Sequence, residues 1–365
     1  MGAVLLVSPH TAALEDLLSD EVGPAYQVAS ADAAWHQHLD AVADRASGAA
    51  ASVPAALAVA RDLGQSAPMP GSGRTAQLWE LLATVASADL TVARVLEPHL
   101  DALAIREQAE LVAATDSTWG VFAAEGPGVA VTATEGANGW QLSGTKPWCS
   151  LAGELDRALI TAHTVVDGEP SRRLFEIDLR DPGVTVATGG WFARGLTDVR
   201  SESIDLDAVP ASPVGDDGWY LTRAGFAWGG MGVAAVWHGA TVALARTLAT
   251  KLASREPDQI GLMLLGEVDV LLHASRAVLA SAADDVDAGI GDPALLAQRV
   301  RSTVSSAAER VTAIVGHALG PAPLAMDEEH ARRVADLALY VRQDHAERDL
   351  ARLGGMVLDQ GIPPW

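Results

Sequence analysis

The sequence is poor in cysteine, in aromatic residues and in basic residues. Its single cysteine, Cys149, cannot form an intrachain disulfide, and such a chain suits a reducing cytoplasm. Aromatic residues make up only 5% of the chain, but hydrophobic residues make up 49%, which is enough for a full core in 365 residues. The composition therefore predicts a cytoplasmic globular protein with two or three subdomains.

Basic residues are outnumbered by acidic residues, 25 to 47, and the formal net charge is -22. Such a charge repels phosphate backbones and anionic lipid surfaces, so we expect no nucleic-acid partner. It also repels a CoA thioester at long range, and a ligand of this kind would need a locally basic entrance. The ten histidines and one cysteine show no cluster with ligand spacing, which argues against a zinc enzyme.

Long uncharged runs are scarce as well. One run, from Ala224 to Ala245, carries no formal charge and is long enough to span a bilayer. It contains five glycines, at positions 225, 229, 230, 232 and 239. So many glycines favour a buried loop that leads into a core helix, and we expect no membrane span.

The first part of the chain has the pattern of a helical domain, which we expect over residues 1–117. A Pro/Gly/Ser break at 67–73 separates two helical stretches. After it, apolar residues recur at spacings of three and four, which predicts a helix that continues to about Ala114. The series is Leu82, Ala86, Leu90, Ala93 and Leu96.

The middle of the chain, residues 118–217, has the alternation and turns of a β domain. Val129, Val131 and Ala133 alternate with smaller or polar residues, and Asn138-Gly139 predicts a tight hairpin turn. Further strands are expected at 157–165, 173–179, 184–188 and 201–209.

The last part, residues 218–365, returns to a helical period and predicts a four-helix bundle. Four helices are expected, near 233–252, 265–286, 292–317 and 327–353. Asp292-Pro293 predicts a helix start, with a capping carboxylate and a proline at the first helical position. The order of helices, β domain and bundle indicates an α+β multidomain fold with a β-barrel-like centre.

Three segments of the β domain together resemble a known family. The hairpin from Gly139 to Ser150, with Trp148 near its end, is the most specific of them, and the others are 119–126 and 204–210. The chain from about Leu78 to Leu353 resembles the acyl-CoA dehydrogenase family. The resemblance implies α,β-dehydrogenation of an acyl thioester by FAD, with an electron-transfer acceptor. It also implies a homo-oligomer, either a dimer or a tetramer.

The resemblance assigns flavin contacts to two segments. The segment Phe122-Ala123-Ala124 would offer backbone groups to the pyrimidine edge of the isoalloxazine ring. Trp148 would pack on the ring, and Ser150 would place its hydroxyl near flavin N5 and O4. From the residues alone, an ordinary buried strand at 122–124 and a core aromatic at Trp148 stay open.

Contacts to the cofactor diphosphate differ from the family pattern. The Gly-Ser-Asp that should follow residues 125–128 is missing, and Arg255 is the substitute for a basic residue in a shortened segment. Gln343 and His345 are candidate replacement donors, although the pattern favours a charged face of the last helix. We therefore expect FAD to bind more weakly than is usual in the family.

The resemblance also implies a catalytic carboxylate. Counted from Gly320, its position falls on Asp327, with Glu328 as a neighbour, and Asp336 follows nine residues later. The alternative is that Asp327 only caps a helix that begins with acidic residues. A second location used in the family aligns with Gly229, which offers no carboxylate.

Three functions are compatible with the sequence. The first is dehydrogenation of an acyl thioester with Asp327 as the base. The second is a related flavin oxygenase or desaturase, which needs no such carboxylate. The third is a non-catalytic partner subunit that forms a heteromer with a homologue and lends half of a cofactor site.

Overall fold

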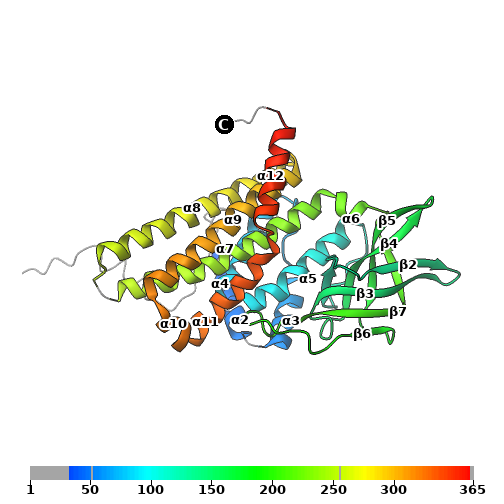
Figure 1. Ribbon diagram of the computed structural model, residues 1–365, viewed down its shortest axis with the longest axis horizontal. Helices are drawn as coiled ribbons and strands as arrows, with labels where there is room; N and C mark the ends of the chain where they lie inside the picture. The colour runs from blue at the N-terminus through cyan, green and yellow to red at the C-terminus, as the bar shows by residue number, and fades with distance from the viewer. Residues whose placement is uncertain (1–32, 51, 255, 362–365) are drawn as a thin grey trace, which may run out of the picture.

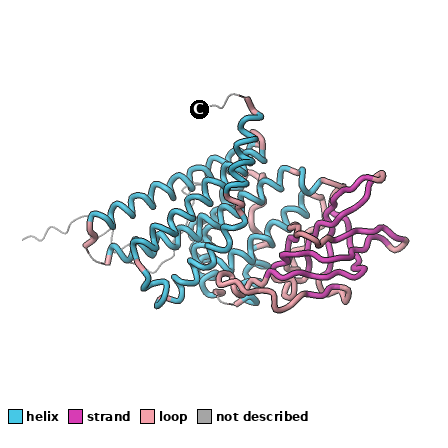
Figure 2. Tube along the Cα trace, in the orientation of Figure 1, coloured by secondary structure: helices cyan, strands magenta, loops and turns pink. Residues whose placement is uncertain are grey.

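The computed structural model describes residues 33–50, 52–254 and 256–361. Helices form one side of the molecule and a set of strands forms the other, as Figures 1 and 2 show. A continuous core of buried apolar side chains runs through both parts. The α+β fold class with a central barrel and C-terminal helices is confirmed.

Within residues 33–118 of the described ranges, four helices precede the strands. They are α2 (Ala33–Gly48), α3 (Val53–Leu63), α4 (Thr75–Ala88) and α5 (Leu90–Gln108). The 67–73 break falls between α3 and α4, as predicted. The long α5 reaches from the helices to the strands and packs against the first of them.

The expected single helix from 82 to 114 is wrong, because the chain turns at Asp89. The Asp89 carboxylate accepts a hydrogen bond from Val92 N at 2.9 Å and thereby caps α5. The same carboxylate lies 2.6 Å from Arg332, far along the chain. The apolar period runs through both helices, so it does not reveal the break.

Seven strands form the β domain. They are β1 (Trp119–Phe122), β2 (Val131–Gly136), β3 (Gly139–Ser150), β4 (Arg157–Val166), β5 (Glu169–Asp178), β6 (Val184–Val186) and β7 (Ser201–Val214). Six of them follow the order β1-β4-β2-β3-β7-β5, and β6 pairs with β7 beside this path. A further pairing of β5 with β4 closes a barrel. The predicted hairpin joins β2 to β3, with Gly136 opposite Gly139.

Three long helices follow the barrel after the short α6 (Trp219–Thr222). They are α7 (Ala224–Ala253), α8 (Gln259–Ala288) and α9 (Pro293–Leu319). Asp292 caps α9 through a hydrogen bond from Ala294 N at 2.9 Å, and Pro293 opens the helix as predicted. The helix α7 is packed against α4 and α9 and lies in the core.

The loop expected over the glycine-rich run is wrong, since this run is helical from Ala224 onward. Close packing explains the glycines: a Cβ at Gly239 would lie only 2.0 Å from the carbonyl oxygen of Ala83 on α4. No helix in the described ranges combines the length and the apolarity that crossing a bilayer requires.

The last helix is also divided, contrary to the single helix expected over 327–353. In its place are α11 (Glu328–Tyr340), the 3-10 turn η1 (Val341–Gln343) and α12 (Glu347–Asp359), and the short α10 (Pro321–Met326) precedes them. Ala346 has a φ of 50°, which a helix interior does not allow, and its N–H donates to the Asp344 carboxylate at 2.9 Å. This local hydrogen bond separates α11 from α12.

Candidate functional site

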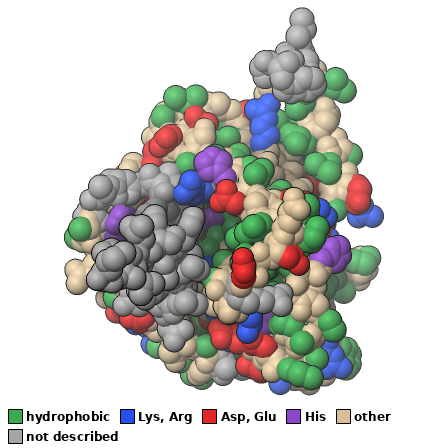
Figure 3. Space-filling model, turned by 90° about the vertical axis from the view of Figure 1, so that its left-hand side faces the viewer, with side chains coloured by type: hydrophobic (Ala, Val, Ile, Leu, Met, Phe, Trp, Pro, Cys, Tyr) green, Lys and Arg blue, Asp and Glu red, His purple; other side chains and the backbone are tan. Residues whose placement is uncertain are grey.

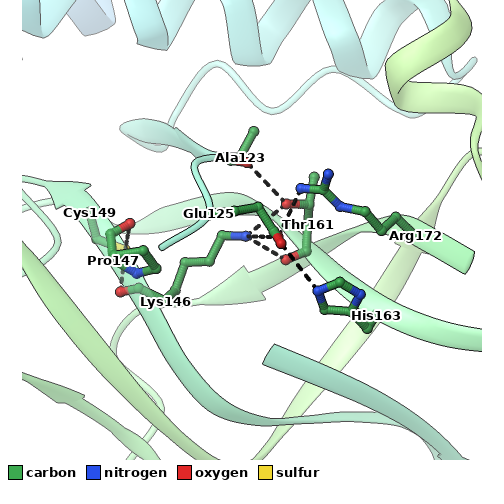
Figure 4. Close-up of polar contacts among 8 residues, drawn as sticks. All are labelled: Ala123, Glu125, Lys146, Pro147, Cys149, Thr161, His163 and Arg172. Atoms are coloured by element: carbon green, nitrogen blue, oxygen red, sulfur yellow. Dashed lines mark hydrogen bonds and ion pairs between the residues drawn. The ribbon is translucent and has the colours of Figure 1, made fainter. Parts of the chain in front are cut away.

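A buried lysine fixes the strands around the predicted flavin contacts. Lys146 on β3 donates from Nζ to the backbone oxygen of Thr161 at 2.9 Å and to its Oγ1 at 2.8 Å, both on β4 (Figure 4). Thr161 Oγ1 in turn lies 3.5 Å from the carbonyl oxygen of Ala123. These bonds hold the end of β1 against β3 and β4.

Glu125 supplies the opposite charge in this cluster. Its carboxylate lies 3.6 Å from Lys146 Nζ, 2.8 Å from Arg172 and 3.3 Å from His163 (Figure 4). Burial alone would raise the pKa of Glu125, but the charges of Arg172 and Lys146 outweigh it and lower the pKa. Glu125 therefore stays ionised and keeps the segment after β1 in place.

Trp148 lies on a bulge of β3. The pairing of β3 with β7 shifts between Lys146 and Cys149, and Trp148 has a φ of 61°. A bulge of this kind re-aims a side chain, and the indole is 61% exposed. Because a large aromatic side chain gains nothing from water, this position suits a surface that a ligand or another chain covers.

Ser150, two residues later, connects the barrel to the helices. Its Oγ accepts a hydrogen bond from Arg94 Nη2 on α5 at 3.0 Å and shares another with Ser201 Oγ at 2.7 Å. The other guanidinium nitrogen, Arg94 Nη1, is buried and has no hydrogen-bond partner among the described residues. Arg94, Phe122 and Ser150 line one small cavity of about 20 Å³ between α5 and β1.

Two carboxylates lie one helical turn apart on the same face of α5. Glu97 Oε2 accepts a hydrogen bond from Tyr340 of α11 at 3.2 Å. Burial raises the pKa of Glu97 from 4.5 to about 7, against the smaller opposing effect of Arg94. Burial also raises the pKa of Asp101 to about 6, and the charge of Arg223 offsets this only in part.

Both carboxylates line a second, mostly apolar cavity between α4, α5 and α7. Its walls include Leu82, Trp79 and Trp228, and its volume is about 30 Å³. That is room for one or two water molecules. The pair of raised pKa values in an apolar cavity is an arrangement that can take up and release protons near neutral pH.

The other predicted cofactor residues that the structure describes are exposed. Ala124 is exposed just beyond β1. Gln343 and His345 lie exposed between α11 and α12, where the backbone oxygen of Gln343 accepts from Arg301 at 2.9 Å. His345 contacts Asp349, at 3.5 Å from its ring Nδ1. Arg255 lies outside the described residues.

No family model matches the sequence, and no curated protein matches it either. Solved structures do match. Butyryl-CoA dehydrogenase from Megasphaera elsdenii is 16% identical, with a TM-score of 0.76 over 91% of this chain and 100% of the other. The chain has the acyl-CoA dehydrogenase fold. The fold suggested by the β-domain motifs is thus confirmed.

Other proteins with the acyl-CoA dehydrogenase fold also resemble the chain. KijD3, solved with FMN and a dTDP-linked amino keto sugar, is 22% identical, with a TM-score of 0.75 over 95% of this chain and 98% of that one. FMN-bound TdsC from Paenibacillus sp. A11-2 is 18% identical, with a TM-score of 0.69 over 90% and 98%. At these identities the likeness establishes the fold alone.

Within this fold, Asp327 and Glu328 lie at the start of α11. The Asp327 carboxylate accepts a hydrogen bond from His330 N at 3.1 Å, which is a helix cap. The Glu328 side chain is 87% exposed and lies 3.8 Å from Arg332. In the described part of the chain, no hydrogen bond or ion pair joins either acid to Arg94 or Ser150. The role of Asp327 as a base stays a prediction.

Sequence reasoning missed the charged residues on α5. Arg94, Glu97 and Asp101 lie on the face of α5 that also carries buried apolar residues, and their partners are far away in the sequence. The available signal was the placement of Glu97 four residues after Ala93 of the apolar series. A charged residue on the buried face of a helix indicates a functional site more strongly than a charged residue on its exposed face.

Proposed function

We propose that the protein is a flavin-dependent oxidoreductase whose flavin ring lies against Trp148 and Ser150. The observation that carries the proposal is the exposed Trp148 side chain, two residues from the Ser150 hydroxyl, to which Arg94 donates from α5; Arg94 Nη1 makes no hydrogen bond among the described residues. A flavin has a flat apolar face and an edge of hydrogen-bond acceptors, and these groups match both. Bound flavin would supply the two-electron chemistry.

The residues of this chain would each have a physical role at the ring. Trp148 covers an apolar face, and the Ser150 hydroxyl donates to the edge of the ring. Arg94 brings a positive charge that favours the negative charge of a reduced flavin. The Lys146 and Glu125 cluster keeps the Phe122–Ala124 backbone at the pyrimidine edge.

We propose FMN as the flavin, in place of the FAD that the sequence resemblance implies. FMN has a single phosphate and so does not require the diphosphate contacts that are absent after Gly128. The likeness to KijD3 and TdsC, both solved with FMN, supports this choice. FAD, if it binds, would leave its second phosphate without the family's partners.

We expect the purified protein to bind FMN more tightly than FAD. The Ser150→Ala variant should raise the FMN dissociation constant about tenfold, because one hydrogen bond to the ring is lost. Flavin fluorescence titrations with both cofactors measure this.

The control for this titration is Ser143→Ala, on the same strand, where the hydroxyl accepts from Ala208 N at 3.1 Å. It should bind FMN as the wild type does. Failure of both flavins to bind would contradict the proposed function, and equal FMN binding by Ser150→Ala would remove Ser150 from the ring.

For the reaction we propose oxygenation of a small substrate. Such an oxygenase takes two electrons from a reductant, transfers one oxygen atom of O₂ to the substrate and releases the other as water. The cavity lined by Glu97, whose carboxylate lies 3.9 Å from Arg94 Nη1, has a volume of about 30 Å³, which favours a small substrate over an acyl chain. The likeness to a nitrososynthase from Micromonospora carbonacea var. africana adds support.

Dehydrogenation of an acyl thioester is the second candidate, because the raised pKa values of Glu97 and Asp101 suit a general base. The two candidates differ in what reduces the flavin. Butyryl-CoA, added without oxygen, should leave the absorbance of bound oxidised FMN unchanged. Bleaching of the flavin by butyryl-CoA would favour the dehydrogenase, with an electron-transfer acceptor as the partner.

We propose that the chain forms a homo-oligomer. None of the described residues of α12 is buried, and Leu350 and Leu358 on it are 51% and 74% exposed. Such apolar surface is typical of contacts between chains. On the face in Figure 3, Lys and Arg side chains are scattered among acidic and apolar ones.

A further inference from the structure

The Asp101 carboxylate occupies space that a side chain at position 229 would need. A Cβ at Gly229 of α7 would lie 2.7 Å from Asp101 Oδ1, closer than real contacts allow, and 3.3 Å from its Cγ. Only glycine fits at 229 while the carboxylate is there. The sequence offers no carboxylate at position 229, but the fold brings one to it from α5.

A second polar group in the same cavity also has no partner. The indole nitrogen of Trp79, a residue with no exposed surface, makes no hydrogen bond within the described residues. It lies 3.9 Å from the position of a Cβ at Gly232, and both residues line the cavity together with Asp101. An N–H left unpaired in an apolar wall costs free energy unless a ligand or water accepts from it.

Burial raises the pKa of Asp101 and so favours proton uptake, and the charge of Arg223 opposes this only in part. Glu97 on α5, Tyr220 on α6 and Arg223 face it, and only Arg223 is positive. No hydrogen bond to the Asp101 carboxylate is found in the described part of the chain, so its oxygens are free to meet a ligand. Glu97, in contrast, is already bonded to Tyr340.

We propose that Asp101 is the proton acceptor of this cavity, that Trp79 is its neutral hydrogen-bond donor, and that the substrate enters with an N–H or O–H group. The proton passes to Asp101, while the electron pair stays on the substrate nitrogen or oxygen. Trp79 donates to that same atom. The inference rests on the proposed function, because it concerns the substrate of that site.

The first test uses the protein without flavin. Infrared difference spectra recorded against pH should show two carboxyls that titrate near pH 6 in the wild type, Asp101 and Asp336, and the band of Asp101 should be missing in Asp101→Asn while that of Asp336 remains. Asp327→Asn, which changes the other candidate base, should keep the Asp101 band. The double variant Asp101→Ala, Gly229→Asp moves the carboxylate to α7 and should restore it. Loss of the band in Asp327→Asn, or its persistence in Asp101→Asn, would overturn the assignment.

The second test uses the FMN-loaded protein and methylamine as the probe. Methylamine should shift the flavin absorption with saturation, and Asp101→Asn should weaken its binding at least about tenfold. Trp79→Phe should weaken it less, and acetonitrile, which has no N–H, should not bind. Equal methylamine binding by Asp101→Asn would refute the proposal. Failure to bind FMN removes the proposed function, while the infrared test still decides the role of Asp101.

Discussion

The Glu97→Gln variant should be more stable than the wild-type protein above about pH 7, with no difference below about pH 4.5. Burial raises the folded-state pKa of Glu97 from 4.5 to about 7. The folded protein therefore binds this proton more tightly than the unfolded chain, so stability falls as pH rises through this window. Glutamine cannot ionise and avoids the loss, which at 1.4 kcal/mol per pKa unit is about 3 kcal/mol.

Urea unfolding of both proteins at several pH values measures this difference. The glutamine oxygen still accepts from Tyr340, so the hydrogen bond at 3.2 Å is kept. Glu107→Gln, at an exposed position on the same helix, is the control and should show no such pH dependence. If Glu97→Gln is instead less stable at high pH, the ion pair with Arg94 outweighs the cost of burial.

The strands could be predicted from the sequence because their signals are local. Alternation and the Asn138-Gly139 turn define β2 and β3 without reference to the rest of the chain. The break at Asp89 and the division between α11 and α12 could not be predicted in this way. At Asp89 the apolar period continues across the break and hides it. At both breaks the carboxylate of a short side chain, Asp89 or Asp344, accepts a hydrogen bond from a backbone N–H two or three residues later, and this ends the regular helix.

The site could be predicted only where a motif carried it. Trp148 and Ser150 come from the hairpin motif, and the structure places Ser150 against Arg94. Arg94 could not be found, because its partner Ser150 lies 56 residues away. Asp101 was missed for the same reason: its significance depends on Gly229, on another helix. Pairings between distant helices leave no local pattern in a single sequence.

The Gly239→Ala variant should lose about 2 kcal/mol or more of folding stability. Its methyl group would lie 2.0 Å from the oxygen and 2.7 Å from the carbon of the Ala83 carbonyl. These are backbone atoms of α4, which cannot rotate away as a side chain can, so α4 and α7 would have to separate. This packing sets the position of α7, and therefore of Gly229 beside Asp101.

Gly266→Ala provides the matched control for this prediction. Gly266 is exposed within α8, and a Cβ there meets no atom within 4 Å. Because alanine favours a helix over glycine by up to about 1 kcal/mol, this change should stabilise the protein slightly. Thermal and urea unfolding of the two variants should thus shift in opposite directions. A Gly239→Ala protein as stable as Gly266→Ala would contradict the close approach of α4 and α7, and with it the narrow cavity that both helices line.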